Sequence, residues 1–444
     1  MLLFLILLCL PFQVGKHFWP DIAFVTGIRV DYLSPTLFLT DILLFLLLIL
    51  VVVNNVPNIT QKKLRSLFGK KLFWATCFLF VSLFISAFLS IRPMLSIMGI
   101  VRILEALFFG WYVFYSINKK QVSFVFILIP LSLGVLFESF LGFGQYINQG
   151  SLGGALYFFG ERTFTSQTPG IANVSLDGQL TLRPYGTLSH PNLLAAYLFV
   201  CLYLLIVFLT TQVSKNILWW FFLVSFLVGS FGLFLTLSRV VICCYLIVVI
   251  FFLLKKHLQK KIWFVTGILP LFLVIIFTTP LSSRFLSISL IDQSVTLRLA
   301  LLAAAQKLFF SYPLFGVGYS QFLVWLPQVL VYRGSVFILQ PVHNAYLLLL
   351  TEIGIVGFLP VLFLIIALCR YVISKNTIFI PLLFSILFLC FFDHYFLTIE
   401  QGRLLLALVI GLCLFPFKSF VPLTPREKSS KRKVVHKLST GFST

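Results

Sequence analysis

Long apolar runs recur along the whole chain, and short polar segments separate them. A helix of about 20 apolar residues, within a range of roughly 17–25, spans a bilayer. The runs are solidly apolar and do not alternate with polar positions, which favours helices over a β-barrel. The pattern predicts about twelve spans, at residues 2–14, 36–53, 72–90, 94–116, 121–142, 189–210, 217–235, 240–254, 262–279, 344–369, 377–396 and 404–417.

These spans predict an all-α polytopic membrane protein with a single transmembrane domain at residues 1–417. We expect the basic tail, 418–444, to be disordered. Two long loops, at about 143–188 and 280–343, lie on one side of the membrane, and long loops of this kind are usually functional. The N-terminus has no basic region before its apolar run, so we read it as a retained first helix.

The second long loop carries an amphipathic stretch, Thr296 to Ser311. Its apolar positions include Leu297, Leu301 and Leu308, whereas Arg298 is polar. This spacing predicts a helix that lies at the membrane surface.

The composition excludes an ordinary soluble protein. Hydrophobic residues make up 60% and charged residues 10% of the chain, whereas soluble domains have roughly 45–50% and about 25%. The formal net charge of +21 fits either nucleic-acid binding or a membrane protein with basic cytoplasmic loops.

The distribution of the basic residues separates these two readings. If the lysine-rich segment between the second and third spans is cytoplasmic, 21 of the 33 lysines and arginines fall in cytoplasmic segments, and both termini are cytoplasmic. There the charge meets anionic membrane lipid, and nucleic acid is not needed to explain it. All eight cysteines fall inside apolar spans, which indicates small apolar side chains rather than a metal site.

The outer segments receive eleven basic residues, and nine of them are arginine. Arginine grips phosphate through two parallel hydrogen bonds. Three arginines flank spans or lie on the surface helix, namely Arg183, Arg239 and Arg298. They could neutralise a diphosphate and stabilise it as a leaving group. The alternative is that each arginine only reaches the membrane interface.

His343 opens the tenth span on the same face. Histidine can take a proton from a hydroxyl group near neutral pH. The alternative is an interfacial histidine beside Asn344, which would cap the helix. Within a span, Arg102 and Glu105 are three residues apart and are expected to form a structural pair. Walker, HExxH and GxSxG patterns are absent, so ATP hydrolysis, zinc proteolysis and serine hydrolysis lack support.

Four motifs in order resemble those of the O-antigen ligase and O-antigen polymerase family. They are Arg183-Pro184-Tyr185-Gly186-Thr187 with His190-Pro191-Asn192; Leu235-Thr236-Leu237-Ser238-Arg239; Pro313-Leu314-Phe315-Gly316-Val317-Gly318; and His343-Asn344-Ala345-Tyr346-Leu347 with Glu352-Ile353-Gly354. The resemblance covers residues of about 180 to 370. The N-terminal stretches 15–20 and 31–35 look like a subgroup trait without an assigned role.

The resemblance implies a glycosyltransferase of the bacterial inner membrane. Such proteins take a glycan from an undecaprenyl-diphosphate carrier on the periplasmic side and transfer it to lipid A core, a growing polysaccharide or protein. Neither a metal nor another cofactor is expected. The motifs place diphosphate binding on Arg183, Arg239 and Arg298, and catalysis on His343 and Arg239. Ligase and polymerase activity remain equally compatible with the motifs.

A transporter or flippase of lipid-linked glycans is the main alternative. Transporters bind near the middle of the bilayer and often contain internal repeats. We find no convincing repeat, and the polar residues gather at one face of the predicted bundle. A membrane scaffold without enzymatic activity is a third possibility.

Overall fold

The computed structural model describes residues 1–54, 61–176, 179–212, 216–254, 293–330 and 339–415. Six helices in these ranges are long and apolar enough to cross a membrane, and three further apolar helices are shorter. The described structure is therefore a helical protein of the multi-pass type. The predicted span 262–279, parts of the second long loop and the tail 418–444 lie outside the described residues.

The helices of the described residues occupy every predicted span there, although several bounds differ. They are α1 (Leu2–Cys9), α2 (Leu39–Val53), α3 (Gln61–Phe88), α4 (Pro93–Asn118), α5 (Phe124–Asn148), α6 (Pro191–Thr211), α7 (Ile217–Leu235), α8 (Arg239–Leu254), α12 (Gln293–Ser311), α13 (Phe322–Val329), α14 (Ala345–Lys375), α15 (Ile380–Leu389), α16 (Tyr395–Thr398) and α17 (Glu400–Leu414). The expected helix at 296–311 is present as α12, whose buried Leu301 and Leu308 belong to the helix face that packs on α14.

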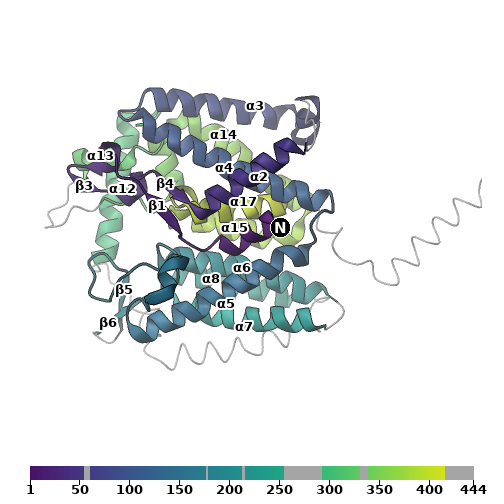
Figure 1. Cartoon of the computed structure of the whole chain (residues 1–444). Coiled ribbons are helices and arrows are strands. Elements are labelled where there is room, and N and C mark those ends of the chain that lie inside the picture. The colour runs from purple at the N-terminus through teal and green to yellow at the C-terminus, as the bar shows by residue number, and fades with distance from the viewer. Residues whose placement is uncertain (55–60, 177–178, 213–215, 255–292, 331–338, 416–444) are drawn as a thin grey trace, which may run out of the picture.

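Helix α6 forms the centre of the bundle. Its side chains are buried along almost its whole length, and it contacts α5, α7, α8 and α17. Figure 1 shows α5 and α7 along one side of the molecule and α3 along the opposite side. Large apolar side chains of the outer helices, such as Phe45, Trp74 and Phe84, are exposed, as expected for a surface that faces lipid.

Short antiparallel strands gather with α12 and α13 at one end of the bundle (Figure 1). The pairs are β1 (Gly15–His17) with β4 (Thr36–Phe38), β2 (Phe24–Val25) with β3 (Ile28–Arg29), and β5 (Asn173–Leu176) with β6 (Gln179–Leu182). All of them except β4, which falls at the start of the predicted span 36–53, lie in segments that the sequence predicts on the outer side. This end of the molecule carries the candidate site.

Gly316 and Gly354 allow α14 to pack closely against the loop 313–318. Gly354 interrupts α14 with a φ of 62°, and Gly316 in the loop has a φ of 69°. The backbones exchange hydrogen bonds here, from Val317 N to Thr351 O at 3.0 Å and from Ile355 N to Pro313 O at 2.9 Å. A Cβ on Gly354 would lie 2.2 Å from Leu314 O. Only glycine fits so close a contact, and these two glycines therefore fix the backbone rather than supply chemistry.

Helix α15 ends at Leu389, earlier than the predicted limit of 396. The Asp393 side chain accepts the backbone N–H of His394 at 2.8 Å. Such a local bond competes with helical hydrogen bonding. The chain consequently turns at 390–394 and presents Asp393 and His394 at the end of the bundle.

Candidate functional site

Arg183 directly follows strand β6 and is almost fully buried, with 7% of its surface exposed. Its Nε donates to the Thr236 carbonyl at 2.9 Å, and its Nη2 donates to Asn192 Oδ1 at 2.7 Å. Neither of these two partners carries a charge, so neither cancels that of the guanidinium. The contacts tie the loop before α6 to the turn between α7 and α8.

Asn192, in the first turn of α6, connects the parts of the site. Its Oδ1 accepts hydrogen bonds from Arg183 and from Ser238 Oγ, the latter at 3.1 Å. Its Nδ2 donates to Asp393 Oδ2 at 2.8 Å. The backbone N–H of Asn192 donates to His190 Nδ1 at 3.1 Å, so His190 caps α6 with an unprotonated nitrogen. One amide side chain thus joins two of the resemblance motifs to the turn after α15.

Asp393 faces His343. The distance from His343 Nδ1 to Asp393 Oδ1 is 3.4 Å, longer than an ordinary hydrogen bond. The second histidine, His394, has its ring centroid 5.3 Å from that of His343. In enzymes without substrate, catalytic hydrogen bonds are often long and shorten when substrate binds. The pair has the arrangement of a base and the carboxylate that orients it.

The start of α14 fixes His343. Asn344 caps this helix by accepting the Leu347 N–H at 2.9 Å, as the sequence suggests. The next residue, Ala345, donates its N–H to the Cys390 carbonyl at 2.8 Å. This backbone bond connects the segment that carries His343 to the turn that carries Asp393.

Burial and charge set the protonation of the groups around His343. Desolvation lowers the pKa of His190 to about 3 and the pKa of His394 to about 4, so both rings are neutral at pH 7. Burial by itself would raise the pKa of Asp393, but the contact with His343 holds it well below its usual range. The site therefore keeps an ionised carboxylate beside His343.

Arg239 and Arg298 border this network from two further helices. Arg239 begins α8 directly after Ser238, which bonds Asn192. In the turn between α7 and Arg239, the buried Leu237 adopts a positive φ of 53°, which is a strained conformation for leucine. Arg298 is exposed on α12, and its charge lowers the pKa of His394. The structure brings Arg183 and His343 into one network and places Arg239 and Arg298 at its borders.

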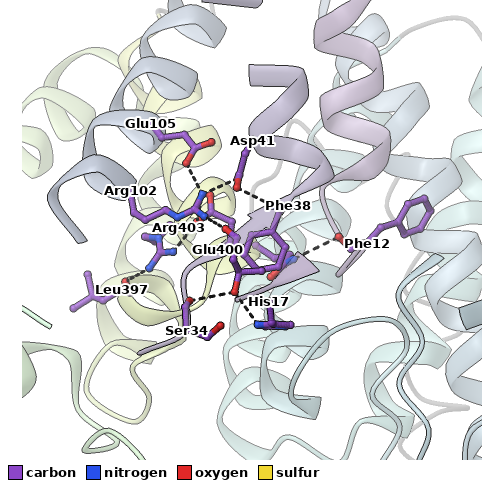
Figure 2. Close-up of polar contacts among 12 residues, drawn as sticks. Phe12, His17, Ser34, Phe38, Asp41, Arg102, Glu105, Leu397, Glu400 and Arg403 are labelled. Atoms are coloured by element: carbon purple, nitrogen blue, oxygen red, sulfur yellow. Dashed lines mark hydrogen bonds and ion pairs between the residues drawn. The ribbon is translucent and has the colours of Figure 1, made fainter. Parts of the chain in front are cut away.

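A second charged group, the ionic cluster, lies nearby and consists of Asp41, Arg102, Glu105, Glu400 and Arg403 (Figure 2). Arg102 Nη1 lies 2.7 Å from Asp41 and 2.8 Å from Glu105. Glu400 accepts from Arg403 Nη2 at 2.6 Å and lies 3.7 Å from Arg102. The expected Arg102–Glu105 pair is confirmed, and it belongs to a larger network.

Two groups of side chains have the spacing of metal ligands within the described part of the chain. In each group, His343–Asp393–His394 and Asp41–Glu105–Glu400, one ligand atom per residue lies within 4.8 Å of the others. In the second group the Arg102 guanidinium already supplies the compensating cation. In the group His343–Asp393–His394, both Asp393 oxygens already accept N–H groups. This carboxylate is therefore at least as well suited to orienting a histidine as to binding a metal.

A comparison with family models supports the family resemblance. Residues 224–364 match the model described as O-antigen ligase. This stretch of the chain is similar to the O-antigen ligase domain. The family prediction is thereby confirmed, and at this level it indicates glycosyl transfer of the O-antigen ligase or polymerase type, from a lipid-linked glycan to a glycan acceptor. A comparison with curated proteins gave no match.

The matched stretch of the O-antigen ligase family includes Arg239, Arg298 and His343, whereas Arg183 and Asp393 lie outside it. The family and the six apolar helices together suggest a multi-pass protein of the bacterial inner membrane. The sequence alone assigned no role to Asn192, His190 or Asp393. The adjacent Asp393-His394 pair was the one signal that could have pointed to them.

Proposed function

We propose that the protein transfers a glycan from undecaprenyl diphosphate to an acceptor hydroxyl, as an O-antigen ligase or polymerase. His343 acts as the general base, and Arg183, Arg239 and Arg298 bind the diphosphate. The observation that carries the proposal is the chain of contacts from Arg183 through Asn192 to Asp393 and His343. It couples a cation suited to phosphate with a base suited to a hydroxyl.

The proposed reaction assigns one task to each group. His343 Nδ1 faces Asp393, so Nε2 is the nitrogen that takes the acceptor's proton. The acceptor oxygen forms a bond to the anomeric carbon, and the bond from that carbon to the diphosphate oxygen breaks. Undecaprenyl diphosphate leaves with the bonding electrons, and the arginines stabilise its growing negative charge. Asp393 stabilises the imidazolium that forms.

The proposed location is the periplasmic side of the inner membrane, with both termini in the cytoplasm. The lysine distribution supports this orientation. The segments assigned to the outer side support it too, since parts of the ranges 13–38, 162–190, 319–323 and 397–403 line one cavity. Donor glycan, membrane lipid and a lipid A core, polysaccharide or protein acceptor are the proposed partners, and no nucleic acid or cofactor is required.

Transfer measured in membranes tests the proposal. With a labelled carrier-linked glycan, H343A and R239A should each lower transfer by about 10²-fold or more, because base and charge stabilisation are lost. R370A is the matched control, since Arg370 is exposed near the far end of α14, and it should transfer normally. Wild-type rates in both site variants at normal expression would refute the assignment.

The flippase alternative predicts that charged residues within the spans carry the function. Glu138 instead accepts hydrogen bonds from the N–H and hydroxyl of Thr187, at 2.9 and 2.5 Å, and thereby anchors the loop behind Arg183. Glycan transport that depends on Glu138 and Arg102 but not on His343 would favour the alternative.

A further inference from the structure

A cavity of about 500 Å³ adjoins the candidate site. Its wall includes Tyr32 and His190. The Tyr32 ring lies 5.7 Å from that of His394, and His190 caps the helix that carries Asn192. The volume is within the range of about 300–1,000 Å³ that is typical of small-molecule sites. A ligand in the cavity would reach the surroundings of His343.

The N-terminal segment, residues 13–38, forms one wall of this cavity. Arg92, the N-cap residue of α4, holds the segment by donating to the carbonyls of Ile22 and Phe24, at 2.9 and 2.7 Å. Arg102 donates to the carbonyl of Thr36, and the Thr36 hydroxyl forms a hydrogen bond with His17 Nδ1 at 2.7 Å. The segment is therefore a fixed wall, although neither the family match nor the proposed reaction gives it a role.

Charge argues against a diphosphate in the cavity. Its wall holds three arginines and three carboxylates, which balance one another: Arg102, Arg162, Arg403, Asp31, Glu352 and Glu400. A diphosphate calls for an excess of cations, and the arginines proposed to bind it, Arg183, Arg239 and Arg298, do not line this cavity. The wall suits a neutral, polar ligand.

Buried oxygen atoms of the wall call for hydroxyl donors. Gln13 Oε1, Ser189 Oγ and Glu400 Oε1 are buried without a hydrogen-bond partner among the described residues. Glu400 is 98% buried. An unpaired buried acceptor is costly. Aromatic rings such as Tyr32, Tyr185 and Tyr319 complete the wall and offer apolar faces.

From these contacts we propose that the cavity binds a neutral sugar unit of the acceptor and orients its hydroxyl toward His343. Gln13, Ser189 and Glu400 accept the sugar's hydroxyl groups, and the N-terminal segment sets which sugar fits. This inference rests on the proposed transfer, because it names the ligand of a cavity that adjoins the same site.

Binding without transfer is the first test. Saturation-transfer NMR on the purified full chain would use the methyl glycosides of glucose, galactose, mannose and N-acetylglucosamine. We expect at least one to bind, the double variant Q13L/S189A to bind it at least about tenfold more weakly, and R239A to bind it normally. If none binds, or if R239A alone loses binding, the proposal is wrong.

Transfer kinetics separate the acceptor from the donor. In Q13L/S189A membranes the apparent KM for the acceptor should rise about tenfold, with kcat and the KM for the carrier-linked glycan unchanged. A rise in the donor KM instead would assign the cavity to the donor and overturn the inference. If the wild type transfers nothing, the proposed function fails while the NMR result still stands.

Two exposed residues of the N-terminal segment provide a test variant and a matched control that should both leave the fold intact. Asp31 lines the cavity, whereas Asp21 does not, and both are exposed. D31N should change which of the four glycosides binds best or weaken it severalfold, and D21N should match the wild type. If D31N and D21N both behave like the wild type, the segment does not set which sugar fits. This test remains decisive if Q13L/S189A does not fold.

Discussion

Two buried charge networks lie at the same end of the bundle, and they differ in how each carboxylate is compensated. Asp393 is held by the N–H groups of Asn192 and His394 and faces the titratable His343. In the ionic cluster, Asp41 and Glu105 are held by the permanently charged Arg102. Neutral N–H donors leave the negative charge of Asp393 available to a proton on His343. A permanent cation such as Arg102 instead keeps its carboxylate partners ionised and fixed in place. We infer that the first network carries chemistry and the second carries stability.

The largest expected effect tests the first network. D393N keeps the shape of the side chain but removes the charge that stabilises a protonated His343. We expect transfer to fall by about 10²- to 10⁴-fold, far more than any loss of folded protein. The unfolding temperature should fall modestly, because the new amide N–H₂ faces one of the N–H donors that Asp393 accepts. Transfer near the wild-type rate would show that the two networks do not differ in function, because Asp393 would then have only a structural role, like Asp41.

The ionic cluster should respond in the opposite way. R102Q removes the cation from between three carboxylates, and breaking a buried pair in this manner costs about 3–5 kcal/mol. We expect a clear fall in the unfolding temperature in detergent, with residual transfer in proportion to the folded protein. R102Q/E105Q should recover part of the loss, since one uncompensated carboxylate disappears. If the R102Q variant is stable but does not transfer glycan, the ionic cluster takes part in the reaction and is not only structural.

The sequence predicts the helices well and the network only in part. Solid apolar runs determine helix positions, so the span 217–235 coincides with α7. The site depends on contacts between distant segments, such as Asn192 with Asp393, which lie 201 residues apart. Periodicity carries no information about such pairs. An asparagine in a helix's first turn has the same local pattern whether or not it joins two loops.

The resemblance motifs also differ in what they do. Arg183 and His343 supply polar side chains to the network, whereas Gly316 and Gly354 only allow two backbones to approach. Sequence similarity alone treats all four as signature positions. Only the backbone geometry separates the glycines from the residues suited to chemistry.

A smaller effect concerns stability against pH. The folded protein holds the pKa of His394 at about 4, below the ordinary value of about 6.5. Between these values the unfolded chain binds a proton that the folded chain excludes, so stability is lost as pH falls from 6.5 to 4. H394Q should flatten this part of the curve of unfolding temperature against pH. The buried His190, whose pKa is about 3, loses stability in the same direction over this range, so an unchanged curve in H394Q would show that His190 dominates it.

The smallest expected effect is that of a metal chelator. His343, Asp393 and His394 have the spacing of a metal site, and a metal there would turn the first network into a charge-compensated group like the second. The proposed reaction needs His343 free to take a proton, and arginines rather than a metal ion hold the diphosphate. We therefore expect EDTA to change transfer less than twofold, and excess Zn²⁺ to inhibit by occupying His343. A loss in EDTA that added Mg²⁺ or Mn²⁺ restores would show instead that a metal stabilises the leaving group, and the arginines would then only position the donor.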